Sequence, residues 1–143
     1  MNFSNLLEIE ELVFSLPRKE TYSDDPLLLI EGGFKPIKID SFDFFILASD
    51  SNFCNPKENF ISVKEYNQVQ IHIEEFLEKD KITALVIPSI DERFIHFDWK
   101  KYFCYQDNAH RIIPSYIGIY VPIKTVFQII KDIKKVARLR TFF

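Results

Sequence analysis

Two histidines in the second half of the chain are the residues best suited to acid–base chemistry. His96 is followed two positions later by Asp98, and residues i and i+2 of a strand share a face, so the carboxylate could orient the imidazole. His110 could act as the second acid or base, and Arg111 could bind a phosphate. Together these four residues describe a metal-free nuclease, provided that the fold brings His110 to His96. No spacing in the sequence requires that approach, so we keep an enzyme as the alternative and assign no catalytic residue.

A second pattern is a pair of acids with a nearby lysine. Asp91, followed by Asp98 and Lys100, resembles the Asp…Asp-x-Lys arrangement of metal-dependent nucleases, in which two carboxylates hold a divalent ion. The two acids are closely spaced, and residues 132–134 repeat the short Asp-x-Lys pattern in an expected helix. The chain has three glycines, too few for a glycine-rich phosphate loop, and lacks a His-Glu-x-x-His motif. We therefore expect no metal site and no cofactor.

Basic side chains are concentrated in the last third of the chain. Residues 1–99 carry 9 basic and 19 acidic side chains, whereas residues 100–143 carry 9 basic and 2 acidic ones. We expect the two regions to attract each other, or to form one acidic and one basic surface. Four cations share one side of the expected last helix, a basic ridge of Lys124, Lys131, Lys135 and Arg138. Such a ridge could bind phosphates, although a pI of about 5.6 disfavours nucleic acid as the main partner.

Three helices are expected to support these residues. The first spans about 5–15, and its apolar arc is wider than a surface helix needs, so it is either well buried or keeps one face for a partner. The second spans 62–78 and starts at a capping box formed by Ser62 and Glu65. The third runs from about 122 to 139, with an apolar face that includes Val126, Ile130 and Ile133.

Strands are expected between the helices, over residues 27–30, 34–39, 42–48, 82–87, 93–99, 102–106 and 112–121. Turns are expected at the two glycines, 32 and 33, and at Asp40 and Ser41. Consecutive strands with short turns pair antiparallel. The order therefore predicts an α+β fold, a single domain over residues 1–143 with a mostly antiparallel sheet of about five to seven strands and three helices packed on it.

Length and composition fit a folded cytoplasmic protein. The 143 residues are 47% hydrophobic and 27% charged, which excludes a disordered chain. No uncharged stretch approaches the roughly 20 apolar residues of a membrane helix. Cys54 and Cys104 are expected to be thiols rather than a disulfide. The sequence leaves the oligomeric state open.

Without a catalytic motif, the favoured function is protein binding. Acidic side chains steer basic partners, and aromatic residues anchor interfaces. The expected contact surface is the outer face of the second helix, with a loop at residues 24–25 as the second choice. The residues are Ile71, Glu74, Glu75 and Glu78 of the helix, and Asp24 and Asp25 of the loop.

A small, acidic, aromatic-rich domain of this kind resembles the immunity proteins of bacterial toxin systems. The resemblance lies in overall profile and not in a motif, so it assigns a role to no residue. It implies an inhibitor that binds a basic toxin, such as a nuclease, and masks its active site. The alternative is a small nuclease or RNA-binding protein that uses the four residues around His96 and His110, or the basic ridge.

Overall fold

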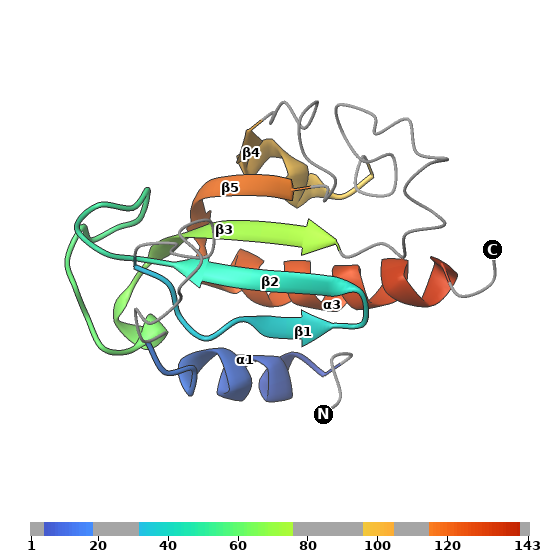
Figure 1. The fold of residues 1–143 in the computed structure, drawn as a ribbon, viewed down its shortest axis with the longest axis horizontal. Coiled ribbons are helices and arrows are strands. Elements are labelled where there is room, and N and C mark those ends of the chain that lie inside the picture. The colour runs from blue at the N-terminus through green and yellow to red at the C-terminus, as the bar shows by residue number, and fades with distance from the viewer. Residues whose placement is uncertain (1–4, 19–31, 76–95, 105–114, 141–143) are drawn as a thin grey trace, which may run out of the picture.

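The computed structural model describes residues 5–18, 32–75, 96–104 and 115–140, and Figure 1 shows their arrangement. An antiparallel sheet and helices in separate parts of the chain confirm the α+β class. The expected count of five to seven strands and three helices is not matched. The described residues form two α-helices and four strands of three or more residues, with a two-residue strand at one edge. The strands expected over 27–30 and 82–87 lie outside the described residues.

All neighbouring strands of the sheet run antiparallel, in the order β1-β2-β3-β5-β4. The strands are β1 (Ile37–Ile39), β2 (Phe42–Leu47), β3 (Gln68–Glu75), β4 (Phe103–Cys104) and β5 (Ser115–Pro122). The predicted turn at Asp40 and Ser41 is present and joins β1 to β2, with Asp40 at a φ of 53°. Alternate residues of each strand face the same side, so one side of the sheet can be almost wholly apolar.

The helix expected over residues 62–78 is wrong at 62–75, and residues 76–78 lie outside the described residues. Ser62 caps only a 3-10 turn, η2 (Val63–Glu65), in which its hydroxyl accepts from the Lys64 amide at 3.2 Å. The backbone is extended from Tyr66 onward and enters β3. Three β-branched residues of β3, Val69, Ile71 and Ile73, are fully buried on one side of the sheet, because such side chains pack well on a pleated surface.

Two helices pack against each other over the core. They are α1 (Leu6–Phe14) and α3 (Ile123–Arg140), and α3 crosses behind the strands in Figure 1. The predicted apolar face of α3 is confirmed, since Val126, Ile130 and Ile133 are fully buried. At the contact between the helices the rings of Phe14 and Phe127 meet edge to face, with centroids 5.6 Å apart.

Helix α1 is fixed at both ends by its own sequence. The side chain of Asn5 accepts from the Leu7 amide at 3.0 Å and so caps the first turn. Ile9 and Val13, one turn apart, are fully buried against the core. The helix ends at Ser15, and the chain turns away just before Arg18.

Arg18 joins three backbone segments that are distant in sequence. Its guanidinium donates to the carbonyls of Gly32 at 2.7 Å, Ala48 at 2.5 Å and Phe60 at 2.9 Å. It also donates to the Tyr66 hydroxyl at 2.8 Å and lies 4.1 Å from the centre of the Phe34 ring. With the second bond to Phe60, all five guanidinium N–H groups have an acceptor. Arg18 therefore ties the end of α1 to the segments before β1, after β2 and before β3.

We expect Arg18→Met to lower the free energy of unfolding by about 3 kcal/mol, because several partly buried carbonyls lose a charged donor. Arg18→Lys should restore only part of this loss, since an ammonium group cannot reach all of these acceptors at once. Urea unfolding followed by circular dichroism measures both changes. Lys35→Met, at an exposed position, is the control and should change the value by less than about 0.5 kcal/mol. Equal effects at the two positions would contradict this role for Arg18.

Candidate functional site

The acidic helix face predicted to bind a partner does not form. Ile71, expected outside among carboxylates, is fully buried in β3, so it cannot be a contact residue. Glu74 lies on the opposite side of the sheet, half-buried, in register with Asp43 of β2. The side chain of Glu75, and residues Glu78, Asp24 and Asp25, lie outside the described residues.

The residues proposed for a nuclease are only partly described, and those described are not joined. His96 lies in a turn, and Asp98 begins the 3-10 helix η4 (Asp98–Tyr102), so the strand expected over 93–99 is wrong at 96–99. Both side chains are exposed, and no hydrogen bond or ion pair links them in this part of the chain. His110, Arg111 and Asp91 lie outside the described residues.

The four residues of the predicted basic ridge all belong to α3. Lys124 and Lys135 are exposed, Lys131 is half-buried, and Arg138 belongs to α3, although its side chain is outside the described residues. The expected attraction between the basic and acidic regions has one clear example, the ion pair of Lys134 with Asp40 at 3.0 Å.

The acid of α3, Asp132, is buried next to the ridge and offsets the charge of one of its lysines. It accepts from the Trp99 indole at 2.9 Å and from the Gln128 amide at 2.9 Å. Lys135 approaches the same carboxylate at 3.9 Å. The bond to Trp99 holds η4 against α3 and uses the only indole of the chain.

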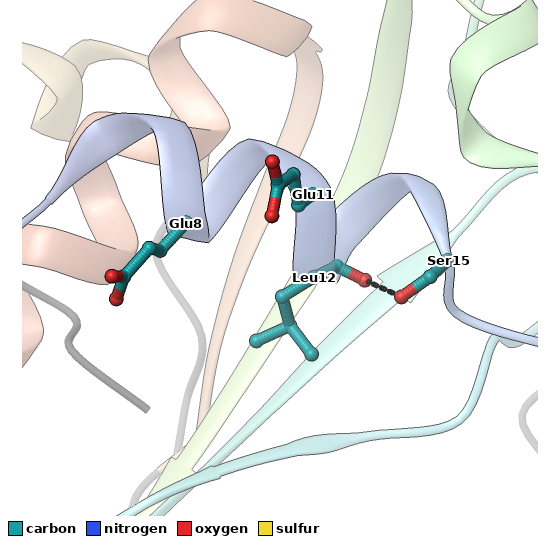
Figure 2. A pocket seen from close by; sticks show the side chains of 4 residues that line it. All are labelled: Glu8, Glu11, Leu12 and Ser15. Atoms are coloured by element: carbon teal, nitrogen blue, oxygen red, sulfur yellow. Dashed lines mark hydrogen bonds between the residues drawn. The ribbon is translucent and has the colours of Figure 1, made fainter.

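The outer face of α1 is exposed, apolar at its start and acidic along its length. Leu6 is 43% exposed and Leu7 is 70% exposed. An open hollow of about 600 Å³ lies against the helix and is lined by Glu8, Glu11, Leu12 and Ser15, which Figure 2 shows projecting from α1. The Ser15 hydroxyl donates to the Leu12 carbonyl at 2.8 Å and closes one end of this face. We call this region, from Leu6 to Ser15, the α1 face.

A hydrogen-bonded chain crosses the sheet on the side away from the helices. Ser49 donates to Asn52 at 2.6 Å, Asn52 to Gln70 at 3.5 Å, and Gln70 lies 3.0 Å from Nε2 of His72. The Phe53 amide donates to Oε1 of Gln70 at 3.1 Å, which fixes the Gln70 amide group so that its nitrogen donates to His72. His72 is thus an acceptor at Nε2 within a hydrogen-bonded network.

Comparison of the chain with protein families, curated proteins and solved structures finds no match. None of the helices in the described ranges is long and apolar enough to cross a membrane. The side chains described between residues 5 and 135 include no group of three or more His, Cys, Asp or Glu placed to hold a metal ion.

Asp43 is a half-buried carboxyl on the side of the sheet away from the helices. Burial raises the pKa of the Asp43 carboxyl above its usual value of 3.8, and Lys38, its register partner on β1, offsets part of this effect. A raised pKa means that the folded state holds this proton more tightly than the unfolded state does. Stability is therefore greatest below the unfolded pKa and declines as the pH rises through the folded pKa.

We expect Asp43→Asn to remove this decline. The free energy of unfolding of the variant, relative to the unmodified protein, should increase as the pH rises above the usual pKa of 3.8 and level off once the folded Asp43 carboxyl is ionised. Urea unfolding at several pH values measures the difference. In a chain that keeps Asp43, Lys38→Met should make the decline of stability with pH steeper, because it removes the cation that favours the ionised carboxyl. A difference between Asp43→Asn and the unmodified protein that stays constant with pH would contradict the account.

Proposed function

We propose that the protein is a binding module that captures a basic protein partner through the α1 face. Within this proposal the partner is a toxin, such as a nuclease, and the module acts as an immunity-type inhibitor in the cytoplasm. The supporting observation is that Leu7, which is 70% exposed, lies on the same side of α1 as Glu11, which lines the hollow together with Glu8. Apolar anchors give affinity at the centre of an interface, while the surrounding charges steer and orient the partner.

The charge of the α1 face favours a basic partner. The helix contains three glutamates, Glu8, Glu10 and Glu11, and no basic residue. Leu7 and Glu11 are separated by four positions, so they lie one above the other on the same side of the helix. A partner side chain that reaches the hollow with a cationic end would meet carboxylates there and a leucine at its edge.

A second apolar side chain extends this surface at the other end of α1. Ile61 is 83% exposed, and its neighbour Ser62 donates from its hydroxyl to the Phe14 carbonyl at 3.4 Å. This bond holds residue 61 next to the last turn of the helix. Leu7 and Ile61 can therefore contact one partner at the two ends of the acidic hollow.

Helix α1 is held in place by its packing against the rest of the protein, which favours binding without reorganisation of the helix. The buried pair Ile9 and Val13 and the ring contact of Phe14 fix one side of the helix, and Arg18 fixes the segment that follows. A preformed surface loses less conformational freedom on binding than a mobile one. For a nuclease partner, carboxylates held in this way can take the place of substrate phosphates against the cations of its active site.

We expect Leu7→Ser and Glu11→Lys each to reduce recovery of the partner at least tenfold. The tagged chain is used to capture proteins from a nuclease-treated lysate of the source organism, and mass spectrometry quantifies the recovered basic protein. The loss follows from removing an anchor residue or reversing a steering charge at the centre of the contact. The purified partner is then assayed for nuclease activity, which the unmodified chain should inhibit at a ratio near one to one.

Glu58→Lys is the matched control, because it makes the same charge change at an exposed position in the segment between β2 and η2. It should leave capture unchanged. Thermal unfolding shows that each variant is folded. If the two α1 variants recover as much partner as Glu58→Lys does, the α1 face is not the contact surface and the proposal is wrong.

A further inference from the structure

We propose that two copies of the chain associate through an exposed aromatic pair, Phe53 and Tyr120, on the side of the sheet away from the helices. In the part of the chain that the structure describes, five large apolar side chains are exposed. Leu6 and Leu7 lie on α1, and Ile61 lies beside its last turn. Phe53 and Tyr120, 50% and 36% exposed, form a separate patch in which their ring centroids are 6.0 Å apart, edge to face.

Two hydrogen bonds fix the position of Phe53. Its amide donates to Oε1 of Gln70, and its carbonyl accepts from the Tyr120 amide, both at 3.1 Å. The neighbours of Gln70 in β3, Val69 and Ile71, are buried in the same core as α1, so the Gln70 side chain is on the opposite side of the sheet. The aromatic pair is built on that side, and a contact there leaves the α1 face open.

The backbone at Tyr120 keeps its ring in the solvent at a cost to the folded chain. The pairing of β3 with β5 shifts between Val69 and Ile71, so that β5 bulges before Val121. Within the bulge Tyr120 has a φ of 49°, a left-handed conformation that is rare for a bulky residue. Bulges redirect side chains, and strained residues of this kind are concentrated at functional sites. Burial of the ring against a second copy compensates for this strain.

The charges beside the pair favour a second copy over a partner of uniform charge. Lys57 lies 5.8 Å from the centre of the Phe53 ring, and Asp50 and Glu58 are exposed in the same segment. The carboxylates disfavour nucleic acid, and the ammonium group disfavours a strongly basic protein. In a two-fold contact the patch meets itself, so the lysine of one copy can approach a carboxylate of the other. An apolar centre with both signs of charge around it suits such a contact.

The size of the patch predicts a weak dimer. Two partly exposed rings supply only part of the roughly 800 Å² that each partner buries in a standard interface, so we expect a dissociation constant of about 10–100 µM. Analytical ultracentrifugation of the untagged full chain, from about 2 to 300 µM, measures this constant. The unmodified chain should change from monomer to dimer over this range.

Phe53→Ser and Tyr120→Gly should each weaken the dimer at least about tenfold, because each removes an aromatic anchor. Glycine adopts a positive φ without strain, so Tyr120→Gly should keep or raise the midpoint of thermal unfolding while it loses association. Leu7→Ser is the matched control, since it also replaces an exposed apolar side chain by serine, and it should leave the dimer unchanged. Phe53→Ser should still capture the partner of the α1 face, which separates this proposal from the proposed function.

Lys57→Glu tests the contribution of charge. It should also weaken the dimer, because carboxylates of the two copies then face one another, whereas Lys64→Glu, at an exposed position of η2, should not. A monomer at 300 µM would overturn the proposal. So would a dimer that survives both Phe53→Ser and Tyr120→Gly, or one that Leu7→Ser weakens as much as they do, because either result places the contact elsewhere.

Discussion

The arrangement of the molecule depends on how Arg18 binds backbone carbonyls of three segments that lie outside the strands. Irregular segments leave carbonyl groups in places where water is scarce, and each needs a donor. Arg18 supplies donors to Gly32, Ala48 and Phe60 from one planar group, and the Phe34 ring lies against it. The Tyr66 hydroxyl accepts from Arg18 and from the Phe60 amide, which extends the same network. The orientation of α1, and with it the α1 face, follows from this junction.

A close approach near this junction explains one of the three glycines. Gly32 has a φ of 79°, and a Cβ at this position would lie 2.0 Å from Oδ1 of Asn52. Asn52 belongs to the polar chain that runs through Gln70 to His72. The Gly32 carbonyl therefore accepts a hydrogen bond from Arg18, while its Cα lies close to Asn52 of the polar chain. The two networks are joined at a single residue without a side chain.

The amphipathic pattern of α3 could be read from the sequence because its buried and exposed positions follow one period over 18 residues. The turn at Asp40 and Ser41 could be read because it has a local signal. The structure of the segment after Ser62 could not be predicted, because its apolar residues fit both the period of a helix and the period of a strand. Val69, Ile73 and the residues beyond fit a helix, whereas Val69, Ile71 and Ile73 fit a strand. A helix places the apolar Ile71 among acidic residues on its exposed side, whereas a strand places it on the same side as Val69 and Ile73. The position of Ile71 therefore favours the strand.

The surfaces were harder to predict than the elements, because they depend on tertiary contacts. The sequence predicts the wide apolar arc of the first helix, but only packing against α3 decides that Ile9 and Val13 are buried while Leu7 is exposed. The pairing of Phe53 with Tyr120 depends on a bulge and a positive φ, which have no signature in a single sequence. Arg18 resembles any loop arginine until the distant carbonyls are brought to it.

In the proposed function a protein partner covers the α1 face. Hydrogen–deuterium exchange of the full chain, measured with and without the captured partner, tests it most directly because it reports on every described element at once. Such a partner should slow exchange in residues 5–18 and around residue 61 in the complex, with β2 and β3 unchanged. Protection confined to α3, η4 or the sheet, with α1 exchanging as in the free protein, would contradict it.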